Sequence, residues 1–194
     1  VPLLAGIYPD IELVGERFDG PVDYYVPMLS LPLALGTQIG TIPAAIPYLA
    51  ASPSRVARWR EHLGSDGFKI GICWQGNPTP LNPGRSFPLE MFRGIAALPG
   101  VRLISLHKGE GESQIDSQAN GFRVETLGPD FDGAGGAFMD TAAVMTLCDL
   151  VITLDTSVAH VAGGLGVPVW VALKHMADWR WLLHREDTPW YPTM

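Results

Sequence analysis

Short apolar segments alternate with amphipathic segments along most of the chain from residue 69 onward. Five apolar runs predict strands, over 69–74, 101–107, 122–127, 150–154 and 167–173. Apolar residues at helical spacing predict helices over 88–98, 138–148 and 156–165, with a short helix near 113–119. The third strand is the shorter and more polar one, as expected of an edge strand. Alternating strands and helices predict an α/β fold, a Rossmann-like doubly wound parallel sheet in the order 3-2-1-4-5.

The first 52 residues do not follow this rhythm. They contain several prolines, the aromatic pair Tyr24-Tyr25 and short apolar pieces without a regular period. We therefore expect residues 1–52 to be the end of an amino-terminal domain plus a linker, and residues 53–194 to be a carboxy-terminal domain that begins with a helix capped near Ser52. The chain opens without an initiator Met or a signal-peptide pattern, which predicts that it is cut from a longer protein.

Composition narrows the class of protein. Hydrophobic residues make up 47% and charged residues 17%, and no run reaches the roughly 18 apolar residues that a bilayer span needs. The net charge of −7, with only 13 scattered Lys and Arg residues, argues against a nucleic-acid-binding surface. Cys73 and Cys148 lie far apart in apolar segments, so we expect ordinary buried thiols and a cytoplasmic location.

Three polar residues, Asp155, Thr156 and Ser157, stand where the fourth strand ends and a helix begins. They are expected to cap this helix, whose first N–H groups and dipole favour an anion such as a phosphate. The simpler alternative is an N-cap without a ligand. The helix is rich in small residues, which predicts that it lies close on the sheet; these are Ala159, Ala162, Gly163 and Gly164.

The loop after the first strand offers a second, independent signal. In the expected strand order it lies next to the 155–160 loop, at the point where ligands bind open α/β sheets. Prolines and glycines shape it (Gly76, Pro78, Pro80, Pro83, Gly84), and three donors could meet a diphosphate: Gln75, Asn77 and Arg85. Arg85 is equally compatible with a solvated loop residue. Lys108, after the second strand, and His160, one turn into the helix, are further candidate donors, although a surface lysine and a packed histidine are the ordinary alternatives.

Other common sites are not indicated. The segment GAGGAF at 133–138 has Phe138 where a dinucleotide motif needs its third glycine, and it does not open the first β-α turn. No phosphate-binding P-loop motif is present in the sequence, and the five histidines have no metal-ligand spacing. We therefore expect no metal and no cofactor.

Taken together, several segments resemble the carboxy-terminal half of bacterial heptosyltransferase-like glycosyltransferases, especially the type associated with tetratricopeptide repeats. They are GICWQGNP with GRSFPLEMF, SLHKG, DTAAVMTLCDLVITLDTSVAHVAGGLGVPVWV and DWRWLLHREDTPWYPTM. The strand followed by Asp-Thr-x-x-x-His and Gly-x-Pro is the most specific part. RSFPLEMF departs mildly from the family's basic-x-Trp-Pro stretch, because Phe87 replaces Trp.

The resemblance implies one half of a two-domain glycosyltransferase-B fold. In that reading the present chain holds a nucleotide-diphosphate sugar, linked to UDP or ADP, and transfers a hexosyl or heptosyl group with inversion and without metal. Arg85 and the helix start at Thr156 and Ser157 would stabilise the leaving diphosphate. The catalytic base would lie in the missing amino-terminal domain, and the acceptor is unknown, with a membrane-associated glycolipid as one candidate.

Two other classes of function remain open from the sequence. The chain could be a non-catalytic nucleotide-binding or scaffold module of a repeat protein, or a nucleotide-sugar epimerase of related fold. An acidic residue or histidine facing the cleft upstream of this chain would favour the transferase over the scaffold. Product analysis with and without acceptor would separate transferase from epimerase.

Overall fold

The computed structural model describes residues 2–5, 7–8, 10–14, 18–77, 84–116, 121–133 and 136–194. Parts of three expected features lie outside these residues. They are the prolines of the first loop (Pro78, Pro80 and Pro83), the end of the short helix expected over 113–119, and the middle of the glycine-rich segment 133–138.

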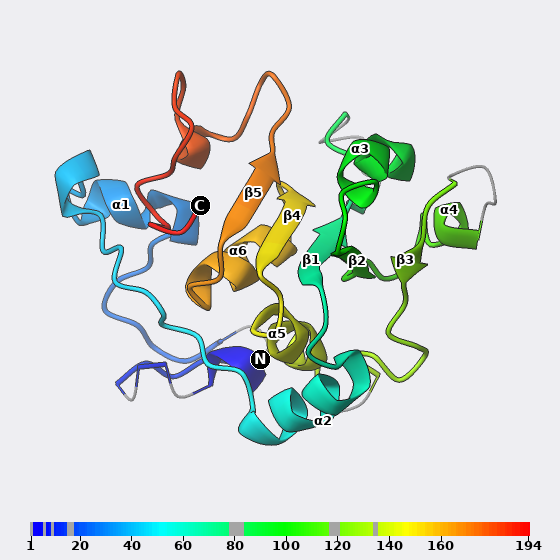
Figure 1. Ribbon diagram of the computed structural model, residues 1–194. Coiled ribbons are helices and arrows are strands. Elements are labelled where there is room, and N and C mark those ends of the chain that lie inside the picture. Colours follow the sequence, from blue (N-terminus) through cyan, green and yellow to red (C-terminus); the bar gives the residue numbers. More distant parts are fainter. Residues whose placement is uncertain are drawn as a thin grey trace.

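A five-stranded parallel sheet forms the centre of the molecule (Figure 1). Its strands are β1 Phe68–Cys73, β2 Val101–Ser105, β3 Val124–Glu125, β4 Leu150–Leu154 and β5 Val169–Ala172. Their order is β3-β2-β1-β4-β5, and every adjacent pair is parallel. The α/β class, the parallel sheet and the strand order predicted from the sequence are therefore confirmed.

Helices cover both faces of the sheet, since successive strand residues point to opposite sides. On one face lie α2 Pro53–Leu63, α5 Met139–Met145 and α6 Ser157–Gly164. On the other lie η4 Leu89–Phe92, α3 Arg93–Ala96 and α4 Ser113–Asp116. Within β1, Ile70 and Ile72 face the second group of helices, whereas Cys73 faces the first.

Several elements are shorter than the sequence predicted, among them one helix and the edge strand. The helix expected over 88–98 is a 3-10 turn that passes into one turn of α-helix and stops at Ala96, and Gly94 lowers its helix propensity. The strand expected over 122–127 is reduced to Val124 and Glu125 at the sheet edge. A two-pronged ion pair ties this edge to β2, because Arg102 donates to both carboxylate oxygens of Glu125 at 2.8 and 2.7 Å.

Residues 1–52 contain only short helices, and none of their described residues forms a strand. The helices are η1 Pro2–Leu4, η2 Met28–Ser30, α1 Leu31–Ala34 and η3 Ile39–Thr41. Many of their apolar side chains are exposed, including Tyr24 at 93%. Leu3 and Leu49 instead pack into the core beneath the sheet. That this segment ends a preceding domain stays a prediction.

The small residues of α6 serve a purpose that the sequence did not indicate. A Cβ added at Gly163 would lie 2.6 Å from the Tyr191 ring, and one added at Gly164 would lie 2.7 Å from Leu49. The two glycines therefore make room for chain segments from both ends of the sequence, and not for the sheet. Ala159 and Ala162 are fully buried.

Asp140 joins α5 to α2. Its carboxylate is 1% exposed and accepts hydrogen bonds from Arg55 at 2.7 Å, Arg58 at 2.5 Å and the Trp59 indole at 2.9 Å. The backbone N–H of Asp132 donates to its second oxygen at 3.1 Å. A buried carboxylate without partners would be strongly destabilising. The four hydrogen bonds to Asp140 offset that cost and allow its carboxylate to lie in the core.

The Asp140 carboxylate also predicts acid sensitivity. Burial alone would raise the pKa of Asp140, but the hydrogen bonds from Trp59 and Arg55 outweigh it, so the pKa lies below its ordinary value. A carboxyl whose folded pKa is depressed stabilises the fold above its unfolded pKa of about 3.9, and this contribution is lost as pH falls through the folded value. Urea unfolding at a series of pH values should show a loss of stability below about pH 4 that is smaller in Asp140→Ala. Parallel curves for the two proteins would contradict this assignment.

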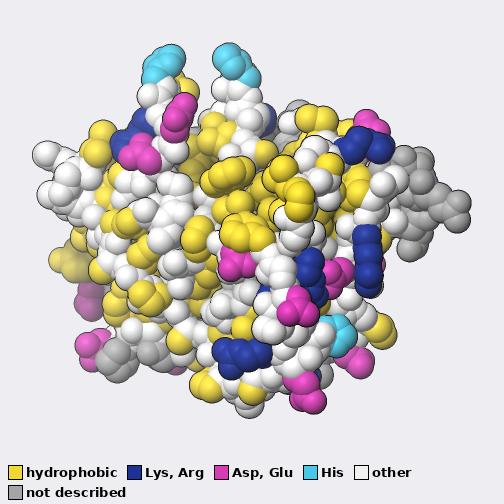
Figure 2. All heavy atoms as spheres, in the orientation of Figure 1, with side chains coloured by type: hydrophobic (Ala, Val, Ile, Leu, Met, Phe, Trp, Pro, Cys, Tyr) yellow, Lys and Arg dark blue, Asp and Glu magenta, His cyan; other side chains and the backbone are white. Residues whose placement is uncertain are grey.

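The surface carries no concentrated cationic patch on the face seen in Figure 2, where Lys and Arg side chains alternate with Asp and Glu. Hydrophobic side chains reach this face over the β4 and β5 part of the sheet, and Trp170 of β5 is 63% exposed. Among the described residues no helix is both long and apolar enough to cross a bilayer.

Candidate functional site

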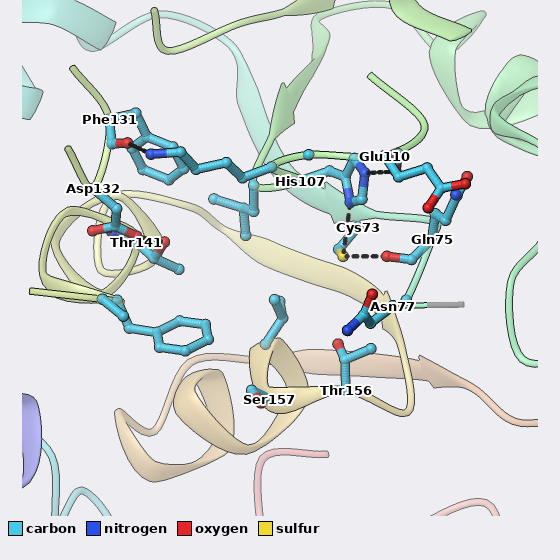
Figure 3. A pocket seen from close by; sticks show the side chains of 17 residues that line it. Cys73, Gln75, Asn77, His107, Glu110, Phe131, Asp132, Thr141, Thr156 and Ser157 are labelled. Carbon is cyan, nitrogen blue, oxygen red and sulfur yellow. Dashed lines mark hydrogen bonds between the residues drawn. The ribbon is translucent and has the colours of Figure 1, made fainter. Parts of the chain in front are cut away.

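The sheet reverses its winding between β1 and β4, and two cavities meet there at the start of α6. The β2-side cavity, about 590 Å³, is lined by residues that include Gln75, Asn77, Lys108, Phe131, Thr156 and Ser157 (Figure 3). The β5-side cavity, about 470 Å³, is lined by residues that include Arg85, Asp155, Thr156, Ser157, His160 and Arg180. All eight site residues expected from the sequence thus line one cavity or the other, and Thr156 and Ser157 line both.

The start of α6 separates the two cavities. Thr156 occupies the N-cap position in extended conformation, but its side chain makes no capping hydrogen bond within the described part of the chain. Its hydroxyl instead donates to the carbonyl of Leu154 at 3.4 Å. The expectation that a side chain caps this helix is therefore not met. The first N–H groups, at Ser157 and Val158, have no intrahelical partner, and both residues line the β2-side cavity.

Arg85 bridges the two loops that form the site. Its Nη2 donates to the carbonyl of Asn77 at 3.0 Å, and its Nη1 donates to the carbonyl of Asp155 at 3.4 Å. The guanidinium lies against Gly76, where a Cβ would stand 2.6 Å from Nε. Arg85 is thus a partly buried, oriented cation beside the start of α6, and the interpretation as a freely solvated loop residue does not describe its contacts.

Gln75 is held in one orientation by a residue that sequence reasoning missed. The N–H of Leu89 donates to Oε1 of Gln114 at 2.9 Å, so the Gln114 amide nitrogen must donate elsewhere. It does so to Oε1 of Gln75 at 3.2 Å. The side-chain oxygen of Gln75 is thus engaged as an acceptor, and its amide nitrogen is the group that can donate to a ligand. The signal in the sequence was weak, because Gln114 lies in a short helix away from the motifs.

Lys108 lines the β2-side cavity together with Phe131. Its ammonium donates to the carbonyl of Phe131 (Figure 3), and it also lines a neighbouring cavity along β2 and β3. Lys108 therefore lies at the carboxyl ends of the strands, as predicted. It does not share a cavity with Arg85, which lines the β5-side cavity but not the β2-side cavity.

Cys73 and His107 form the floor of the β2-side cavity. The Cys73 thiol contacts the His107 ring nitrogen Nδ1 at 3.8 Å, and the other nitrogen of that ring is 2.6 Å from the carbonyl of Glu110 (Figure 3). Burial raises the pKa of the Cys73 thiol. Burial likewise raises the pKa of Cys148, to about 12. Both cysteines are free and buried, as expected from their apolar neighbours.

Asp132 shapes the far wall of the same cavity. Its carboxylate accepts hydrogen bonds from the N–H of Asp140 at 2.6 Å and from the hydroxyl of Thr141 at 2.5 Å. Asp132 therefore caps α5, and its φ of +50° places it in the left-handed region that Asp and Asn tolerate best. Its carboxylate is engaged by the start of the helix. Within the described part of the chain no group of three His, Cys, Asp or Glu side chains is arranged to hold a metal.

Comparison with known proteins was made by sequence and by structure. No family model matches the chain. It is 26% identical over 213 residues to Protein FlbA of Caulobacter vibrioides, a match that covers all of this chain and 35% of FlbA. The chain thus spans about a third of the length of this curated relative.

Similar solved structures include E. coli ADP-heptose lps heptosyltransferase II, with 12% identity and a TM-score of 0.47 over 63% of this chain and 38% of that one. A glycosyl transferase family 9 protein from Veillonella parvula DSM 2008 shows 19% identity and a TM-score of 0.46, over 63% and 36%. E. coli heptosyltransferase WaaC with ADP-2-deoxy-2-fluoro heptose shows 16% identity and a TM-score of 0.49, over 76% of this chain and 44% of that one. These proteins are of the class that the sequence motifs resemble. At such identities the likeness concerns the fold, and activity is a separate matter.

Proposed function

We propose that this chain is the donor-binding part of a metal-independent, inverting glycosyltransferase that uses a nucleotide-diphosphate sugar. One observation carries the proposal: Arg85, held by the carbonyls of two loops, lies beside a helix start whose N-cap side chain leaves the first N–H groups open. An oriented guanidinium and a helix N-terminus are two independent donors for the same kind of ligand, a phosphate. The motif resemblance in the sequence supports the same conclusion.

The two cavities suit the two ends of such a ligand. The β2-side cavity offers apolar side chains, among them Leu106, Phe131 and Phe138, together with the Gln75 amide, as a base and ribose require. The β5-side cavity is more polar and suits a sugar. The diphosphate would then lie between them at Thr156 and Ser157, the residues that line both. UDP and ADP are the two nucleotides proposed.

The chain's own residues act on the leaving group. When the bond between the anomeric carbon and the diphosphate oxygen breaks, negative charge builds up on the diphosphate. Arg85 and the N–H groups at the start of α6 are in place to stabilise that charge without reorganisation. We propose that the base that removes the acceptor proton lies in an amino-terminal acceptor domain and not among the described residues of this chain.

Isothermal titration calorimetry tests the proposal directly. We expect UDP or ADP to bind, with the same affinity in the presence and absence of a chelator. The matching nucleoside, uridine or adenosine, should bind much more weakly, because it lacks the diphosphate. Absence of binding for both nucleotides, or binding that the chelator abolishes, would refute the metal-free donor site.

A further inference from the structure

Two segments from opposite ends of the chain converge on α6 next to the β5-side cavity. Tyr191, near the carboxy-terminal end, packs its ring against Gly163, and Tyr48 lies against Gly164. The N–H groups of Tyr48 and Leu49 both donate to the carbonyl of Gly164 at 2.9 Å. The side chain of Tyr48 also contributes to the raised pKa of the Tyr191 hydroxyl. The two tyrosines therefore form one polar cluster on the back of the helix.

His160 is the next member of this cluster. Its Nδ1 lies 3.0 Å from the hydroxyl oxygen of Tyr191, and its ring stacks on Trp181 with centroids 5.6 Å apart and planes at 13°. The stacked indole fixes the plane of the imidazole, and the tyrosine engages one of its two nitrogens. His160 also lines the β5-side cavity, so Nε2 is the nitrogen that remains for a ligand there.

Both partners are neutral near neutral pH. Burial lowers the pKa of His160, and the nearby Arg180 lowers it further, against smaller opposing effects of Asp155 and Asp178. Burial raises the pKa of the Tyr191 hydroxyl. A neutral imidazole carries one N–H, so the direction of the bond to Tyr191 decides which nitrogen bears the proton.

We propose that Tyr191 is a positioning residue for His160: its hydroxyl donates to Nδ1, which places the ring proton on Nε2 and makes that nitrogen a donor to an anionic ligand. The proposal rests on the proposed function for the nature of the ligand. A tyrosine hydroxyl has one proton, and the proton of Tyr191 is the one that this bond to His160 uses. If Nδ1 of His160 donated to Tyr191 instead, Nε2 would carry a lone pair, which would repel the anion beside Ser157.

The experiment combines a spectroscopic and a binding measurement on the same protein. Long-range ¹H–¹⁵N correlation spectra at about pH 8, where a histidine is neutral, report which ring nitrogen carries the proton. In the wild type we expect the Nε2-protonated form for His160, with its signals identified by their loss in His160→Gln. Tyr191→Phe keeps the ring against Gly163 and removes the hydroxyl. It should shift His160 toward the other tautomer and weaken nucleotide binding by about three- to tenfold, the effect of one neutral hydrogen bond.

Controls separate positioning from packing. Tyr24→Phe removes a hydroxyl from a side chain that is 93% exposed and should change neither measurement. Tyr48→Phe removes the hydroxyl near Tyr191 but keeps the bond between Tyr191 and His160, so His160 should keep the tautomer of the wild type. An Nδ1-protonated His160 in the wild type, or unchanged tautomer in Tyr191→Phe, would overturn the proposal. If the wild type binds neither UDP nor ADP, the donor site fails, while the tautomer spectra still decide the role of Tyr191.

Discussion

Replacing Asp140 with alanine should lower the free energy of unfolding by about 3–5 kcal/mol, the usual cost of removing one partner of a buried ion pair. The carboxylate is 1% exposed and serves Arg55, Arg58, Trp59 and the backbone of Asp132. Without it, the Trp59 indole N–H and the Asp132 N–H lose their acceptor inside the protein, and the two guanidinium groups lose their counterion. The loss also removes the link between α2 and α5.

Urea unfolding followed by tryptophan fluorescence measures this effect, because Trp59 itself is buried in the same core. The matched control is Asp187→Ala, which breaks the ion pair between Arg185 and an aspartate that is 66% exposed. Solvent screens such a pair, so this variant should unfold close to the wild type. Similar losses in both variants would mean that Asp140 contributes no more than a surface charge.

The strand order was predictable because its signal is local and repeated. Each strand is a short apolar run bounded by a helix, and right-handed crossovers then leave few ways to wind the sheet. The Asp140 cluster was not predictable, because it joins side chains that are about eighty residues apart in the chain. An Asp at the start of a helix reads equally well as a dipole-stabilising residue. Only the packing of α2 on α5 shows that it is a core acceptor.

That the candidate residues come together was predictable from the sequence, whereas the arrangement of their side chains was not. The loops after β1 and β4 had to meet, because the strands that carry them are neighbours in the sheet. The sequence could not show that Thr156 turns its hydroxyl back to Leu154, or that Gln114 orients Gln75. The glycines of α6 were misread for a similar reason. Which side of a helix is covered depends on where distant segments such as 48–49 and 191–194 return, and periodicity carries no information on that.

Replacing Arg85 with alanine should weaken binding of the nucleoside diphosphate about ten- to a hundredfold and leave the fold intact. The guanidinium is aligned by the carbonyls of Asn77 and Asp155 next to the start of α6, and it lines the same cavity as Thr156 and Ser157. A hydrogen bond from a charged donor contributes about 1.5–3 kcal/mol, which corresponds to that range of affinities. Lysine should restore only part of the affinity, because it keeps the charge but lacks the planar fork that reaches two carbonyls and a ligand.

Two further variants make the Arg85 result specific. Gly76→Ala keeps the charge but places a Cβ 2.6 Å from Arg85 Nε, so the guanidinium must move and the affinity should fall between those of the wild type and Arg85→Ala. Arg60→Ala removes an exposed cation from the last turn of α2, on a different element, and should leave the affinity unchanged. Calorimetric titration of all five proteins with the nucleotide that the wild type binds, with thermal unfolding as a check on the fold, measures these differences. Equal affinities for the wild type, Arg85→Ala and Arg85→Lys would show that Arg85 holds the two loops together without touching the diphosphate.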